Sequence, residues 1–176
     1  MTTHLITERC IIREVDLTDL SDFFEMDSDP LVHKYLGNKP VKTIKESELI
    51  IESIKEQYRV NGIGRWVIED KHTGDFIGWT GLKLEQKLRD FSYYDIGYRL
   101  KQKYWGYGFA YETAKACLDH GFNTLELPAI GAAAEQDHVV SNHILKKLGL
   151  KHKGNFAFDT SLCNWYWLSR EEWLHE

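Results

Sequence analysis

The sequence KYWGYGFAYETA, residues 103–114, places two glycines, Gly106 and Gly108, between a strand-like run and a helix-like run. The preceding run, FSYYDIGYRL at 91–100, alternates as a strand does, and apolar residues recur at helical spacing over 108–122. Two interpretations compete for this connection. It is either a tight turn without a ligand or a loop that binds phosphate through its backbone.

Familiar nucleotide motifs do not fit the two glycines. A G-x-G-x-x-G fingerprint would need glycine where Tyr111 stands, and the spacing and Lys-Ser/Thr pair of a Walker loop are absent. The position nevertheless favours phosphate, because amides at a helix start lack intrahelical partners and the helix dipole adds partial positive charge. Lys103 would add a point charge three residues before Gly106.

Two longer segments carry a resemblance to a known family. YDIGYRLKQKYWGYGFAYETAKA (94–116) and AAAEQDHVVSNHILKKLGL (132–150) together resemble the GCN5-related N-acetyltransferase (GNAT) superfamily. Within it they are most similar to the branch typified by ribosomal-protein N-terminal acetyltransferases. The opening LITERCIIREVDLTDL, from residue 5 to residue 20, is similar to that branch too, so the resemblance covers nearly the whole chain.

The resemblance implies acetyl-CoA as the cofactor and a loop of the form [QR]-x-x-G-x-[GA]. That loop falls on Lys103, Gly106 and Gly108, and the branch's YWGxGxA falls on Tyr104, Trp105, Gly106, Tyr107, Gly108, Phe109 and Ala110. It also implies an α/β (α+β) fold with a mixed, mostly antiparallel sheet and flanking helices. In that fold the strand at 91–100 splays from the one at 129–134, and pantetheine pairs with backbone groups of Ile96, Gly97 and Tyr98.

The sequence departs from the family pattern in the helix at 139–149. His138 stands where the family has Asn, and Leu145 stands where it commonly has a Tyr proton donor. His138 is a candidate for the cofactor contact that the Asn would make; the alternative is that it simply follows the helix cap at Asp137. Ser141 matches a serine of the branch and is the candidate to hydrogen-bond the cofactor sulfur; the alternative is a hydrogen bond to its own backbone.

The expected reaction is direct attack of a primary amine on the thioester. Asp95, on the splayed strand and beside the slot that it leaves, is the candidate general base, with Glu135 and Asp159 as substitutes. A protonated α-amine has a pKa of about 8 and an alkyl ammonium a pKa of about 10, so the α-amine needs a weaker base to become a neutral nucleophile. Cys117 is a poor candidate nucleophile, because helical periodicity points it inward. The alternative function is a noncatalytic acyl-CoA-binding module of the same fold.

Composition excludes several classes of protein. At 176 residues and 43% apolar the chain is predicted to form one domain, residues 1–176, with no window near the ~20 apolar residues that span a bilayer. A net charge of −5 argues against nucleic acid as a partner. Three unpaired cysteines indicate a reducing, cytoplasmic setting. His138 and His143 are five apart, so no metal site is expected.

Periodicity predicts the order β α α β β β α β α β β. The ranges are strands at 9–15, 64–70, 76–84, 91–100, 129–134 and about 154–170 (a pair), and helices at 16–29, 44–58, 108–122 and 139–149. In the helix at 44–58 the buried stripe is predicted to be Leu49, Ile50, Ile54 and Tyr58. A protein N-terminus, an antibiotic amine, a polyamine and an amino acid all remain possible acceptors, and the chain is expected to be a monomer or homodimer.

Overall fold

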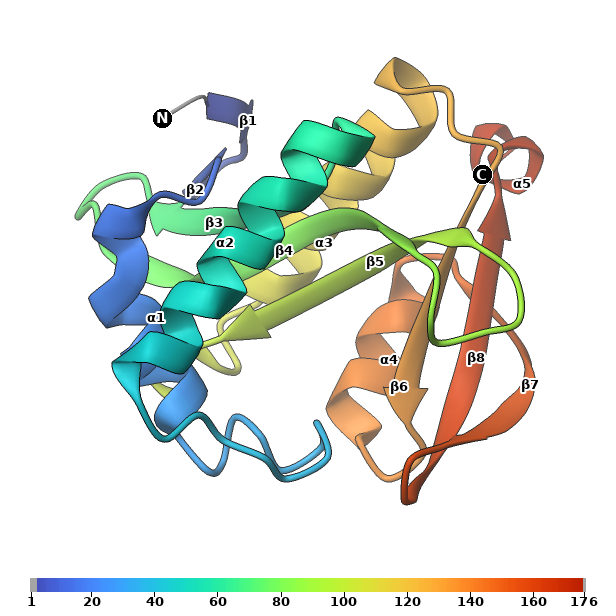
Figure 1. Ribbon diagram of the computed structural model, residues 1–176. Helices are drawn as coiled ribbons and strands as arrows, with labels where there is room; N and C mark the ends of the chain where they lie inside the picture. Colours follow the sequence, from blue (N-terminus) through green and yellow to red (C-terminus); the bar gives the residue numbers. More distant parts are fainter. Residues whose placement is uncertain (1–2, 176) are drawn as a thin grey trace.

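The computed structural model describes residues 3–175, in which one mixed sheet of eight strands forms the centre (Figure 1). The strands are β1 (Thr3–Ile6), β2 (Cys10–Arg13), β3 (Arg65–Asp70), β4 (Phe76–Glu85), β5 (Tyr93–Leu100), β6 (Ala129–Glu135), β7 (Lys151–Phe158) and β8 (Ser161–Ser169). Their order across the sheet is β1-β2-β3-β4-β5-β6-β8-β7. All neighbours are antiparallel except β5 and β6, so the predicted fold class is confirmed.

Four longer helices cover the two faces of the sheet (Figure 1). They are α1 (Leu20–Ser28) and α2 (Ile44–Asn61) on one face and α3 (Phe109–Asp119) and α4 (Val139–Lys147) on the other, with the short α5 (Arg170–Leu174) at the end. Neither β1 nor α5 was expected. β1 has four residues and pairs only with β2 at the sheet edge, and α5 is held by a capping box between Ser169 and Glu172.

α2 begins where its sequence predicts but continues past residue 58 to Asn61, and its buried stripe is displaced. The Thr43 side chain accepts a hydrogen bond from the Glu46 amide, and Gly62 ends the helix at a φ of 67°. Ile51 and Ile54 are buried against the sheet, whereas Leu49 is 59% exposed. The prediction for Leu49 was therefore wrong, because helical spacing fixed the period of the stripe but not which residues face the sheet.

The largest part of the core lies between the sheet and the helices α3 and α4. Cys117 and Leu118 from α3, Leu145 from α4 and Tyr166 from β8 are all at most 2% exposed in one cluster. Burying each large apolar side chain there stabilises the fold by about 1.5–3 kcal/mol. This packing holds both helices rigidly against β5 and β6.

β5 and β6 are paired at one position only, Asp95 opposite Gly131. Beyond it, β5 continues to Leu100 paired with β4 alone, and β6 continues to Glu135 paired with β8 alone. The two strands therefore diverge toward their carboxyl ends and open the β5–β6 gap, as expected. The glycine loop follows β5, and α4 follows β6, so both stand at this opening.

Candidate functional site

The loop after β5 presents backbone amides without side chains in the way. Gly106 and Gly108 have φ values of +82° and +85°, which favour glycine, and a Cβ on Gly106 would meet no atom within 4 Å. Gly108 is the N-cap of α3, and no side chain caps the first turn. The loop is therefore open, and its amides fit an anionic phosphate group.

Aromatic side chains anchor this loop to the rest of the fold. The Trp105 indole N–H donates to the Leu100 carbonyl at 2.9 Å, which fixes the loop to the end of β5. The Tyr104 ring meets Phe109 edge-on at 6.0 Å between centroids. Phe109 and Ala110 are each 8% exposed and pack into the core. Lys103 is exposed, and its ammonium lies 5.0 Å from the Tyr104 ring centroid.

Arg9 is a second positive charge beside the loop, one that sequence reasoning missed. Its guanidinium lies 4.3 Å from the Phe109 ring centroid, donates to the Tyr107 carbonyl at 2.9 Å and pairs with Glu112 at 2.7 Å. Burial raises the pKa of Glu112, but hydrogen bonds from Thr7 and Arg9 outweigh it and lower that pKa overall. No local signal connects residue 9 to residue 112.

Two hydroxyls meet across the β5–β6 gap on the α4 side. The Tyr98 hydroxyl of β5 lies 3.1 Å from the Ser141 Oγ of α4 and 3.3 Å from the Ser141 carbonyl. Burial raises the pKa of Tyr98, against the opposing effect of the Ser141 hydrogen bond, so the phenol is protonated at neutral pH. Tyr98 was expected only as a backbone contact.

Asp95 lies on the opposite face of the sheet, in a buried ion pair with Arg65. The Arg65 guanidinium also donates to the Asp95 carbonyl at 2.8 Å. The other carboxylate oxygen has the Tyr93 hydroxyl at 3.4 Å. Burial raises the pKa of Asp95, although Arg65 opposes the shift. A Cβ on Gly97 would lie 2.6 Å from Arg65 Nη2, so only glycine leaves room for the guanidinium there.

The loop between α1 and α2 contacts the carboxyl end of β6 and the start of α4. His138, at the start of α4, stacks on Tyr35 with ring centroids 4.4 Å apart and planes inclined by 13°. Burial lowers the pKa of His138, while Glu135 acts in the opposite direction. The Gly37 amide donates to Glu135 at 3.4 Å. The third carboxylate considered, Asp159, pairs with Lys39 at 3.0 Å.

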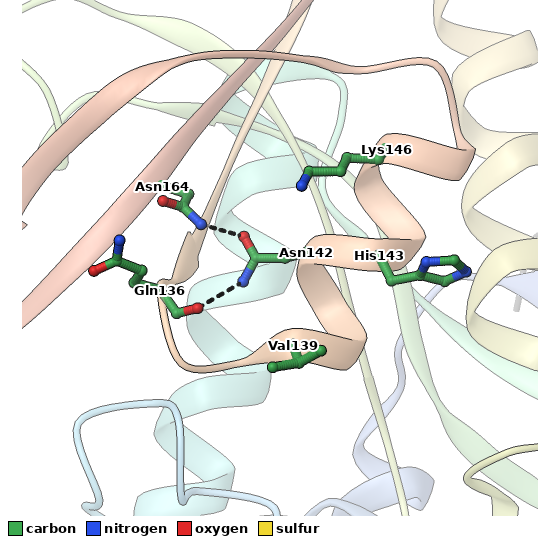
Figure 2. Close-up of a pocket in the computed structure, with 6 residues that line it drawn as sticks. All are labelled: Gln136, Val139, Asn142, His143, Lys146 and Asn164. Carbon is green, nitrogen blue, oxygen red and sulfur yellow. Dashed lines mark hydrogen bonds between the residues drawn. The ribbon is translucent and has the colours of Figure 1, made fainter.

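Asn142 was overlooked in the sequence although it is adjacent to Ser141. Its amide donates to the carbonyls of Glu135 and His138 at 2.9 and 2.8 Å, and its oxygen accepts from Asn164 and Tyr166 at 2.7 and 2.8 Å. Figure 2 shows Asn142 reaching from α4 toward Asn164. Since every polar atom of this side chain has a partner, Asn142 ties the turn after β6 to β8.

A cavity of about 330 Å³ lies beside this asparagine (Figure 2). Its lining residues are Gln136, Val139, Asn142, His143, Lys146 and Asn164. Ser141 is not among them, and neither is any residue of the glycine loop. The cavity is therefore distinct from the β5–β6 gap.

Other chemistries find little support at the site. Cys117 is fully buried, and burial raises the pKa of its thiol to about 12, so it is not a thiolate at neutral pH. Across residues 3–175 no three His, Cys, Asp or Glu side chains are grouped as metal ligands. Of the helices in that range, none is long and apolar enough to cross a membrane.

Residues 9–151 match the family model described as the acetyltransferase (GNAT) domain. The chain belongs to the GNAT acetyltransferase family. This GNAT chain is 32% identical over 151 residues to the uncharacterized N-acetyltransferase YoaA of Bacillus subtilis (strain 168), covering 85% of its own length and 84% of the relative. It is accordingly an acyltransferase, and its family uses acetyl-CoA.

Solved GNAT structures share the fold. The GNAT-family acetyltransferase from Bacillus anthracis superposes with a TM-score of 0.81 at 22% identity, over 96% of this chain and 99% of the other. The spermidine N-acetyltransferase from Vibrio cholerae, in complex with CoA and spermine, gives 0.77 at 18% identity, over 94% and 98%. The open glycine loop and the unpaired strand edges of the gap fit the pyrophosphate and amide groups of CoA.

Proposed function

We propose that this GNAT enzyme transfers an acetyl group from acetyl-CoA to a primary amine by direct attack, without a covalent enzyme intermediate. When bound, acetyl-CoA supplies the thioester. The amine nitrogen bonds to the acetyl carbon, the carbon–sulfur bond breaks, and one proton passes overall from the amine to the sulfur. The observation that carries the proposal is the β5–β6 gap, closed at Asp95–Gly131 and open beside the glycine loop.

The chain would hold the two ends of CoA by different means. The uncapped amides at Gly106 to Ala110 would bind the pyrophosphate, helped by the dipole of α3 and by the positive charges of Lys103 and Arg9. The strand edge at Ile96–Tyr98 lacks a partner on the β6 side and would bind the pantetheine amides. The stack of His138 on Tyr35 would exclude water from the gap beside the carboxyl end of β6.

Proton donation to the sulfur is assigned to Tyr98 and Ser141 together. Their hydroxyls are 3.1 Å apart, at a point where β5 faces α4 across the gap. The Tyr98 phenol stays protonated because burial raises its pKa, so it holds a proton available for a hydrogen bond. Tyr98 thereby supplies from β5 the tyrosine hydroxyl that α4 lacks at Leu145.

Asp95 is the proposed base, acting through the carboxylate oxygen that Arg65 leaves free. That oxygen accepts a hydrogen bond from the Tyr93 hydroxyl at 3.4 Å and belongs to the residue that closes the gap. Burial raises the pKa of Asp95, which makes its carboxylate a stronger base than an exposed one. Asp159 is less suitable, since Lys39 already binds it on the β7–β8 hairpin.

The acceptor is either a small-molecule amine or a protein N-terminus. The sequence resemblance to ribosomal-protein N-terminal acetyltransferases favours the N-terminus, whereas the solved relative from Vibrio cholerae is named for spermidine. The test is release of free CoA thiol from acetyl-CoA during incubation with a panel of amines, amino acids, polyamines and peptides. Acceptor-dependent thiol release, with the acetylated amine identified by mass, supports the proposal.

The same assay includes direct titration of CoA. Tight CoA binding without thiol release from any acceptor would identify a noncatalytic acyl-CoA-binding module instead. A thiol burst equal to the enzyme concentration in the absence of acceptor would reveal a covalent intermediate and contradict direct attack.

A further inference from the structure

Arg89 differs from every other arginine of the chain in its partners. The other six, Arg9, Arg13, Arg59, Arg65, Arg99 and Arg170, each pair with a carboxylate. Within residues 3–175, neither a carboxylate nor any other hydrogen-bond acceptor contacts the Arg89 guanidinium. This side chain is half-buried, and its donors are unused.

Aromatic rings hold the guanidinium of Arg89. Its central carbon lies 4.5, 5.0 and 5.7 Å from the ring centroids of Phe156, Trp165 and Phe91. Tyr93 packs edge-on against Trp165, with ring centroids 4.7 Å apart, and extends the same surface. We call the surface formed by Phe91, Tyr93, Phe156 and Trp165 the aromatic shelf. Contact with aromatic faces fixes a guanidinium while leaving the N–H groups at its edge free to bind an anion.

The loop that carries Arg89 is also fixed. One carboxylate oxygen of Glu85 accepts from the amides of Gln86, Lys87 and Leu88 at 3.0, 2.8 and 3.3 Å. Lys83 pairs with the other oxygen of Glu85. The β4–β5 loop therefore has a defined turn just before Arg89. This turn and the aromatic contacts orient the guanidinium before a ligand binds.

The aromatic shelf runs from Arg89 to the closed end of the β5–β6 gap. A Cβ on Gly131 would lie 2.6 Å from the Trp165 ring and 2.9 Å from the Tyr93 ring, so both rings rest directly on that glycine. Gly131 pairs with Asp95, whose carboxylate lies 3.4 Å from the Tyr93 hydroxyl. In Figure 1 the β4–β5 loop lies over β6 and β8 on this face, opposite α4.

We propose that Arg89 binds a carboxylate of the acceptor, so that the preferred acceptors are amines whose carboxylate lies several bonds from the amine. Short peptides and ω-amino acids have this form. An α-amino acid is too short, because an indole separates Arg89 from Gly131. A single guanidinium matches a singly charged carboxylate better than a phosphate. This inference rests on the proposed function.

The test compares matched acceptors that differ only in the carboxylate. Di- and tripeptides and ω-amino acids of increasing length are assayed for thiol release alongside their carboxamides, with wild type, Arg89→Met, Arg89→Lys and Lys87→Met. Wild type is expected to favour the acids about tenfold or more in kcat/KM, because the charged hydrogen bonds to Arg89 are lost with the amides. Arg89→Met should remove the preference and Arg89→Lys should restore part of it. Lys87→Met loses the same charge from the same loop and should keep it.

A second readout does not depend on catalysis. The arginine Nε–H signals are followed by NMR while each acid or carboxamide is titrated with CoA present, and the Arg89 signal is assigned from Arg89→Lys. Acids are expected to shift that signal and carboxamides to leave it in place. Equal turnover of acids and carboxamides, or an Arg89 signal that ignores the acids, overturns the inference. A shifted signal without thiol release from any acceptor contradicts the proposed function instead.

Discussion

The two faces of the sheet at the β5–β6 gap differ in charge. On the α3 and α4 face the neutral hydroxyls of Tyr98 and Ser141 meet beside the gap. On the α1 and α2 face lie the ion pairs Arg65–Asp95 and Arg99–Asp27, with Arg89 further along the aromatic shelf. The neutral face suits a departing sulfur and pantetheine amides, and the charged face suits selection among amines.

The two faces also differ in how the chain builds them. The neutral face comes from two continuous segments, β5 with its loop and α3, then β6 with α4. The charged face is assembled from α1, β3, β5 with the preceding β4–β5 loop, and the β7–β8 hairpin, which are separate segments of the sequence. The following variants test whether the neutral face serves cofactor binding and the charged face serves the acceptor.

The largest effect is expected from Gly108→Val. A β-branched residue is strained at a φ of +85°, and its side chain would enter the space beside the loop amides. CoA affinity should fall by about 100-fold or more, measured by calorimetric titration. Gly74→Val is the matched control, because Gly74 has a φ of +76° with nothing near its Cβ position and lies in the β3–β4 turn. Equal CoA affinity of Gly108→Val and wild type would refute the loop assignment.

The next effect concerns the charged face. Asp95→Asn leaves Arg65 buried without its counter-charge and should lower the free energy of unfolding by about 3–5 kcal/mol, measured by urea denaturation. The pair Arg65→Met with Asp95→Leu should recover most of this stability but not the activity. If the stable double variant acetylates at the wild-type rate across the pH profile, Asp95 is not the base.

A smaller effect is expected on the neutral face from Tyr98→Phe. Losing the hydroxyl that meets Ser141 should lower kcat by about 100-fold while CoA affinity stays within about twofold. Tyr94→Phe is the control, since Tyr94 points the same way from β5 and makes no side-chain hydrogen bond among the described residues. Equal kcat values for the two variants would remove Tyr98 from the chemistry.

The smallest effect is a dependence of stability on pH at His33. Burial and the charge of Arg99 lower the pKa of His33 below its ordinary 6.5, although Asp27 opposes them. Below pH 6.5 the unfolded chain binds a proton that the folded chain does not, so stability falls as pH falls. The melting temperature should fall more for wild type than for His33→Gln when the pH is lowered from 7 to 5. Parallel curves would contradict this assignment.

Most elements of the fold were predictable because their signals are local. Alternation and helical spacing located the strands and helices around the gap, and the capping signal of α5 was present at Ser169 and Glu172 although unused. β1 was not predictable in the same way. Four residues carry too little pattern, and β1 exists through its pairing with β2.

The residues of the candidate site were likewise predictable only where their signals are local. Gly106, Gly108 and Ser141 could be selected from motifs, because turns and helix starts depend on neighbouring residues. The partner of Asp95 could not be predicted from the sequence, because the register of β3, β4 and β5 is what brings Arg65 to it. Arg9 beside the glycine loop is a similar case, separated from Glu112 by 103 residues.

The sequence by itself determined the loop, the order of strands and helices around it and the family to which they belong. Each depends on backbone preferences and on the spacing of apolar residues over short stretches. The tertiary structure alone decided that Tyr98 meets Ser141, that Asp95 is paired with Arg65 and that Arg89 is left without a carboxylate. Those relations depend on which distant side chains the sheet brings into contact, and charges far apart in a sequence carry no sign of their partners.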